Sequence, residues 1–96
     1  MGRRELDRIR RAVVGGRYEV TEHALLEAEA DGFDAGDIRH ALIRGTVVRT
    51  YTRDTRGVRY LVGGTGRDGR AIDVVCRFTS LRDLRVITVF AHEEER

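Results

Sequence analysis

The sequence predicts an α+β fold in which three N-terminal helices are followed by a four-stranded antiparallel sheet. The first observation is a change in hydrophobic period near Gly45, from about 3.6 residues to two. The second is that short connections separate the later apolar segments, which favours an antiparallel meander. The third is the length of 96 residues, which fits a single domain spanning 1–96 with one modest core.

The first helix is expected over residues 3–14. Its apolar residues Leu6, Ile9 and Val13 are spaced three and four apart, as on one face of an amphipathic helix. Two glycines follow and end the helix. We expect the next segment, residues 17–20, to be extended.

Two further helices are marked by their capping residues. Thr21 is a favourable N-cap for a helix from residue 22 to about residue 31. Asp34 opens the third helix, and Asp37 stands three residues later, where a capping box places its acid. Gly45 ends this helix.

Four strands are expected over residues 46–52, 58–62, 70–78 and 84–91, with a glycine-rich connection at 63–69. The last strand is the most apolar and is therefore expected at the centre of the sheet. The helices should cover one face of the sheet and leave the other partly open. The residues expected in the core are Leu6, Leu25, Ile38, Leu42, Val74, Val86 and Val89.

The charges are unevenly distributed. All 18 basic residues are arginines, and the net charge is only +2. Residues 1–18 carry +4, residues 19–37 carry −7 and residues 38–92 carry +7. This pattern indicates an anionic partner such as nucleic acid, or a self-complementary surface, and its alternative is a solvated surface rich in salt bridges.

Several classes of protein are excluded by composition. No run approaches the roughly 18 apolar residues of a membrane helix, and no apolar stretch follows the first arginines as in a signal peptide, so we expect a cytoplasmic protein without membrane contact. The single cysteine, Cys76, is expected to be a buried thiol. His23, His40 and His92 stand on separate elements without ligand spacing, so neither a metal nor another cofactor is expected.

His23 stands out because it lies in the first turn of the second helix. The positive end of the helix dipole favours its neutral form, which suits a general base. The alternative is a structural histidine that packs the start of the helix.

Several motifs together carry a family resemblance. Residues Tyr18–Ala24 have the form Y-x-x-T-x-H-A, and Gly69-Arg70 and the apolar segments 72–75 and 87–90 follow in order. Over about residues 17–91 this series resembles domain-of-unknown-function family 4258. That family is similar to the barnase–EndoU–colicin–RelE group of ribonuclease folds, which includes toxins of toxin–antitoxin pairs. The resemblance implies a RelE/barnase-like fold with an RNA-cleaving site on the open sheet face.

Metal-independent RNA cleavage needs a base, an acid and groups that stabilise the charge on phosphorus. His23 is the candidate base or acid, and Arg77 is the candidate phosphate ligand. Tyr51 and Thr88 are candidate hydrogen-bond donors, and Tyr51 could also stack on a base. The candidate substrate-binding residues are Arg70 and Tyr18. Arg70 and Arg77 should point to opposite faces of one strand, which favours Arg77.

The sequence therefore predicts an RNA-binding, toxin-like protein, with RNA cleavage as its candidate activity and an antitoxin-like protein as its candidate partner. The alternative is a non-enzymatic interaction module. Its acidic second helix would dock on a basic surface of a partner or of a second copy in a homodimer.

Overall fold

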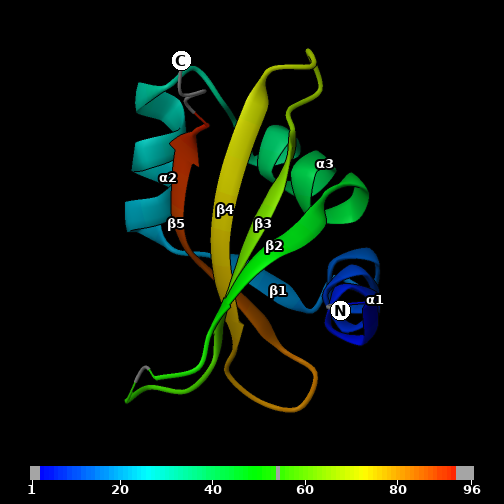
Figure 1. Cartoon of the computed structure of the whole chain (residues 1–96). Coiled ribbons are helices and arrows are strands. Elements are labelled where there is room, and N and C mark those ends of the chain that lie inside the picture. Colours follow the sequence, from blue (N-terminus) through cyan, green and yellow to red (C-terminus); the bar gives the residue numbers. More distant parts are fainter. Residues whose placement is uncertain (1–2, 54, 93–96) are drawn as a thin grey trace.

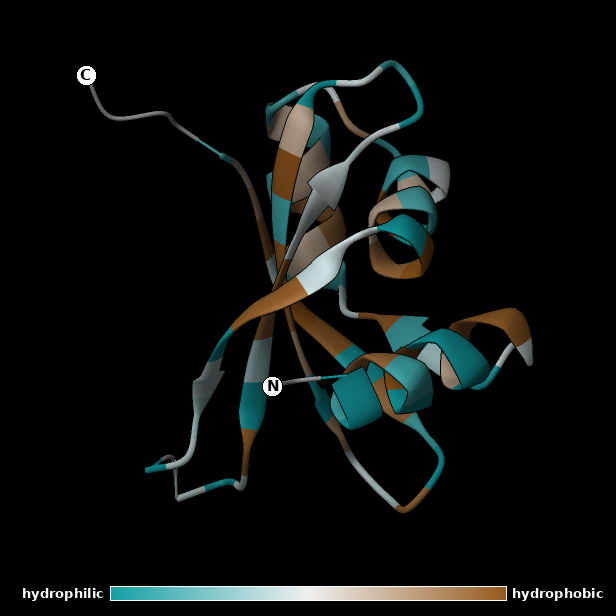
Figure 2. Ribbon diagram, turned by 45° about the vertical axis from the view of Figure 1, so that its right-hand side comes forward, coloured by the Kyte–Doolittle hydropathy of each residue, from teal (hydrophilic) through white to brown (hydrophobic). Residues whose placement is uncertain are grey.

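The computed structural model describes residues 3–53 and 55–92, and its architecture is mixed α+β. The helices are α1 (Arg3–Val14), α2 (Glu22–Ala30) and α3 (Ala35–Arg44). The strands are β1 (Tyr18–Val20), β2 (Thr46–Tyr51), β3 (Arg59–Thr65), β4 (Ala71–Phe78) and β5 (Leu84–Ala91). The turn between β2 and β3 projects away from the helices (Figures 1 and 2). Within the described chain, no helix has the length and apolar character needed to cross a bilayer.

The sheet has five strands in the order β1-β5-β4-β3-β2. The predicted antiparallel pairing of the last four strands is confirmed, but the predicted number of strands and the all-antiparallel sheet are wrong. Residues 18–20 form an extra strand that pairs in parallel with Leu84–Val86, and it lies between α1 and α2 in the chain. The prediction that residues 84–91 form the central strand is also wrong, because β4 lies at the centre.

The outer edge of β5 explains why a non-central strand is so apolar. Strand β1 covers only its first part, and α2 lies against the remainder (Figure 1). Acidic side chains of this region bond to the edge that β1 leaves unpaired. Glu27 accepts a hydrogen bond from the Val89 N–H at 3.1 Å, and Asp31 accepts one from the Ala91 N–H at 3.1 Å. Two acids of the negative segment therefore satisfy the sheet edge, where orphaned backbone groups would be unfavourable.

The predicted helix caps are confirmed. The Thr21 hydroxyl accepts a hydrogen bond from the Ala24 N–H, as an N-cap should. Asp34 and Asp37 form the complete capping box, with both reciprocal bonds at 3.0 Å. These local signals set the starts of α2 and α3 because they satisfy backbone donors that have no partner within a helix.

Most of the predicted core is buried between the helices and one sheet face. Ile38, Leu42, Val74, Val86 and Val89 are fully enclosed. The prediction is wrong for two leucines, which are only partly buried: Leu6 and Leu25. In α2 the buried positions belong instead to small alanines, because the helix lies close to β5.

The glycine-rich connection is shorter than predicted, because Gly63 and Gly64 belong to β3. A Cβ atom at Gly64 would lie 2.8 Å from the Ala41 carbonyl oxygen of α3. The glycine therefore lets α3 pack directly against the strand. The turn itself includes Gly69, whose φ of +89° suits glycine.

A β-bulge shifts the side chains of β5. Val75 of β4 faces Thr88, whereas the next residue, Cys76, faces Val86, so Ile87 is the extra residue. The bulge places both Val86 and Val89 in the core although they are three residues apart. It also places Thr88 on the open face, opposite Val75.

Candidate functional site

A row of arginines crosses the open face of the sheet. Tyr51 of β2 is opposite Arg59 of β3, Arg77 of β4 is opposite Arg85 of β5, and Glu19 of β1 is opposite Arg85. We call Arg59, Arg77 and Arg85 the arginine row. Like charges directly opposite one another destabilise a sheet, so the facing of Arg77 and Arg85 is unfavourable to the extent that acids do not neutralise it.

The arginine row lines a pocket of about 240 Å³, which we call the row pocket. Its other lining residues are Thr21, Arg56 and Ile87. None of these described residues is an aspartate or a glutamate. The row pocket therefore presents four guanidinium-bearing side chains to an anionic ligand.

The three arginines of the row are held in different ways. Arg85 forms an ion pair with Glu19, and the Arg59 guanidinium lies 5.0 Å from the centre of the Tyr51 ring. Arg77 donates from Nη1 to the Arg56 carbonyl oxygen at 2.9 Å. Its buried Nε has no hydrogen-bond acceptor among the described residues. Arg77 is thus fixed by one neutral contact, and its charge is not balanced by an ion pair with any described residue.

This geometry suits a phosphate. A guanidinium offers several donors in one plane, which match two phosphate oxygens at once. The Tyr51 ring lies at the β2 end of the row, where the Arg59 and Arg49 guanidinium groups lie 5.0 and 6.0 Å from its centre, so a base would stack there by displacing one of them. The row pocket can therefore bind a phosphodiester and place a neighbouring nucleobase.

His23 lies on α2, outside the residues that line the row pocket. Its side chain is 72% exposed, and its Nε2 lies 3.3 Å from Oε2 of Glu27. Glu27 is itself fixed by the Val89 N–H. Thr21, the N-cap two residues earlier, does line the pocket. The structure thus places the N-cap of α2 at the pocket, and the exposed imidazole of His23 lies in the turn that follows, outside the pocket lining.

The other predicted residues are divided between two regions. Tyr51 and Arg77 lie on the arginine row, and Thr88 lies on the same face beside Ile87 of the row pocket. Tyr18 packs partly against the hydrophobic core from β1 and lines a separate pocket with Asp83. The structure therefore brings three of the predicted residues to one face.

Arg70 has a different position, at the C-terminal end of α2. It donates hydrogen bonds to the carbonyl oxygens of Asp31 and Gly32 at 3.0 and 2.8 Å. Its guanidinium also stacks on the Phe33 ring at 4.3 Å and pairs with Asp68. These contacts cap the helix with a cation, a position where the helix dipole favours one.

Sequence reasoning missed Thr21, Arg56, Arg59 and Arg85 as site residues. Arg59 and Arg85 come to lie beside Arg77 only because β3, β4 and β5 pair in this register and β3 begins at Arg59. No spacing in the sequence reports that pairing. The excess of arginine after residue 38 was the one signal in the sequence that pointed to these site residues. It did not show which arginines lie on the open face of the sheet and which on the helix-covered face.

Other reactive groups offer little chemistry. Cys76 is fully enclosed, and burial raises the pKa of its thiol to about 12, so it stays protonated and inert. Among residues 3–53 and 55–92, no cluster of three or more histidines, cysteines or acids could hold a metal ion.

Comparison with known proteins gives one match. Residues 20–91 match the model of a family described as Domain of unknown function (DUF4258). No curated protein and no solved structure matched the chain.

Proposed function

This chain belongs to the DUF4258 family of domains of unknown function, and we propose that its open sheet face binds RNA through the row pocket. The observation that carries the proposal is the arginine row itself. Arg77 lies opposite Arg85 on the adjacent strand and forms no ion pair with a described residue, and a phosphodiester would supply the negative charge that Arg77 lacks. Tyr51 at the end of the row would stack on a base and favour a single strand over a duplex.

The finer proposal is metal-independent cleavage by a toxin-like protein related to the RelE/barnase ribonuclease folds. A base removes the proton of a 2′-hydroxyl, the 2′-oxygen attacks phosphorus, and the leaving 5′-oxygen takes a proton from an acid. His23 would serve as the base or the acid, since its imidazole is exposed and lies two residues after Thr21 of the row pocket. Arg77 would stabilise the added charge on phosphorus, with Thr88 and Tyr51 as hydrogen-bond donors.

The alternative, docking of the acidic helix on a protein, has less support in the structure. Glu27 and Asp31 bond to the backbone of β5, and Glu19 pairs with Arg85. These acids are used within the molecule. The RNA-binding proposal also includes a protein partner. An antitoxin-like protein would cover the basic face and so block RNA binding.

Binding of a short single-stranded RNA tests the proposal. Wild-type protein should bind at low salt, and Arg77→Ala should bind roughly tenfold or more weakly, because it loses charge-assisted bonds to phosphate. The dependence of log affinity on log salt should also fall by roughly one for the lost phosphate contact. Arg39→Ala is the matched control, because it removes the same charge from an exposed site on α3.

Two outcomes would count against these ideas. If wild-type protein does not bind RNA at low salt, or if both variants lose affinity equally, the row pocket is not the binding site. If bound RNA is cleaved equally by wild-type protein and His23→Ala, His23 has no part in the chemistry.

A further inference from the structure

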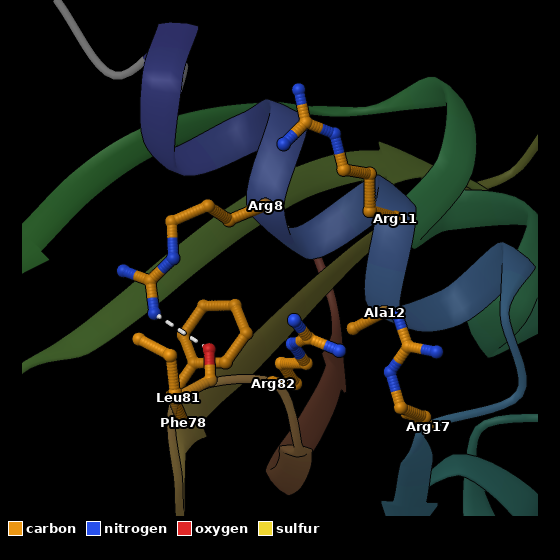
Figure 3. Close-up of a pocket in the computed structure, with 7 residues that line it drawn as sticks. All are labelled: Arg8, Arg11, Ala12, Arg17, Phe78, Leu81 and Arg82. Carbon is orange, nitrogen blue, oxygen red and sulfur yellow. Dashed lines mark hydrogen bonds between the residues drawn. The ribbon is translucent and has the colours of Figure 1, made fainter.

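A second arginine pocket lies on the helix side of the molecule, where α1 meets the loop between β4 and β5 (Figure 3). We call it the α1 pocket. Its volume is about 350 Å³, which is within the range of small-molecule sites. It shares no lining residue with the row pocket. The residues that matter are Arg8, Arg11, Arg17, Arg82, Phe78 and Leu81.

One of these arginines is fixed in advance. The Arg8 guanidinium lies 4.0 Å from the centre of the Phe78 ring, and its Nη2 donates to the Leu81 carbonyl oxygen at 3.3 Å. Stacking and a neutral hydrogen bond hold the group without cancelling its charge. A ligand that meets Arg8 therefore encounters an ordered cation.

Two further arginines complete the cluster from different parts of the chain. Arg17 precedes β1, and Arg82 lies in the loop before β5. Among the described residues, neither side chain forms a hydrogen bond or an ion pair, and no acid lines the pocket. Figure 3 shows these two guanidinium groups directed toward one another, while the guanidinium of Arg11 points away.

We propose that the α1 pocket binds phosphate groups, supplied either by an RNA strand or by a nucleoside diphosphate. One fixed guanidinium group and two groups without a partner among the described residues line one small pocket, where they can engage the oxygens of a compact anion. The carboxylates of an acidic peptide are spaced along a chain and fit cations arranged along a groove instead. The idea that RNA supplies these phosphate groups rests on the proposed function. The idea that the α1 pocket binds phosphate does not.

Calorimetric titration at low salt tests the pocket with three phosphate-bearing probes: pyrophosphate, adenosine diphosphate and a short single-stranded RNA. The variant is Arg17→Ala with Arg82→Ala, whose exposed side chains form no hydrogen bond or ion pair with any described residue, so its melting temperature should match the wild type. The control is Arg39→Ala with Arg44→Ala, which removes the same two charges from exposed positions on α3. Hexaglutamate serves as a carboxylate probe.

We expect wild-type protein and the control to bind pyrophosphate, and the α1-pocket variant to bind it at least about tenfold more weakly. If the α1-pocket variant also loses affinity for RNA, an RNA strand supplies the phosphates. If it loses affinity only for pyrophosphate and adenosine diphosphate, a free nucleotide supplies them. Absence of pyrophosphate binding, equal binding by the variant, or equal affinity for hexaglutamate would overturn the proposal.

The same titrations separate this inference from the proposed function. If RNA binding depends on Arg77 while pyrophosphate binding is unchanged by the α1-pocket variant, only the inference fails. If no RNA binds but pyrophosphate binding depends on Arg17 and Arg82, the proposed function fails and the phosphate pocket stands.

Discussion

The two faces of the sheet are built from alternate residues of the same strands, and β4 shows the contrast most directly. Ile72, Val74 and Cys76 point into the core and have no exposed surface. Arg77, on the other side, joins a row of like charges. A one-residue step thus separates packing that stabilises the fold from charges that oppose it, which is expected where a surface is selected for binding.

The pairing of charged side chains also differs between the helix side and the open side of the sheet. On the helix side, Asp34 and Asp37 pair with Arg67 and cap α3. On the open side, Arg77 faces Arg85 across adjacent strands. Opposite charges that pair contribute to folding, whereas like charges that face one another oppose it, and here Glu19 pairs with Arg85 while Arg77 has no ion pair with a described residue.

The largest expected effect on stability comes from adjacent glycines of β3. Gly64→Ala should destabilise the fold by about 1–3 kcal/mol, because its Cβ would lie 2.8 Å from the Ala41 carbonyl oxygen. Gly63→Ala is the matched control on the open face, where the nearest atoms, of Val48 and Asp73, lie at 3.4 and 3.5 Å. Thermal unfolding of both variants measures the difference, and equal melting temperatures would contradict the close packing of α3.

A smaller effect is expected at Asp37, with a defined pH dependence. Hydrogen bonds, first from the Arg67 backbone N–H and then from that of Asp34, lower the pKa of Asp37 from 3.8 to about 2. Because the folded-state pKa is depressed, this stabilisation is complete above pH 3.8 and is lost as the pH falls through about 2. Asp37→Asn should therefore lower stability by about 1 kcal/mol at pH 7 and by less near pH 2.

Melting curves of wild-type protein and Asp37→Asn between pH 7 and pH 2 provide the measurement. The gap between the two melting temperatures should narrow below pH 4 or so. A gap that stays constant across this range would mean that the carboxylate charge does not stabilise α3.

The smallest effect on stability is expected at His23. Its exposed ring pairs with the carboxylate of Glu27 and with no other described residue, so His23→Ala should change the unfolding free energy by less than about 0.5 kcal/mol. Glu27→Ala is the contrast, because it leaves the Val89 N–H without its acceptor and should cost about 1–3 kcal/mol. A large loss of stability in His23→Ala would instead identify a structural histidine.

The sequence by itself determined the local elements of this protein. Spacing and capping residues predicted three helices, and α1 has the predicted bounds of residues 3–14. The capping box at Asp34 was predictable because both of its partners lie within four residues of each other. Strand alternation likewise placed Val74 on the core face of its strand and Arg77 on the other face of the same strand.

Only the tertiary structure decided which strands are neighbours, and with them the candidate site. The parallel pairing of β1, the bulge at Ile87 and the meeting of Arg59, Arg77 and Arg85 join residues far apart in the sequence. The α1 pocket likewise joins Arg17 to Arg82. Local patterns report the face on which a side chain lies, because that depends on backbone geometry; its neighbours across the sheet depend on register, which is set by long-range packing and by the turns.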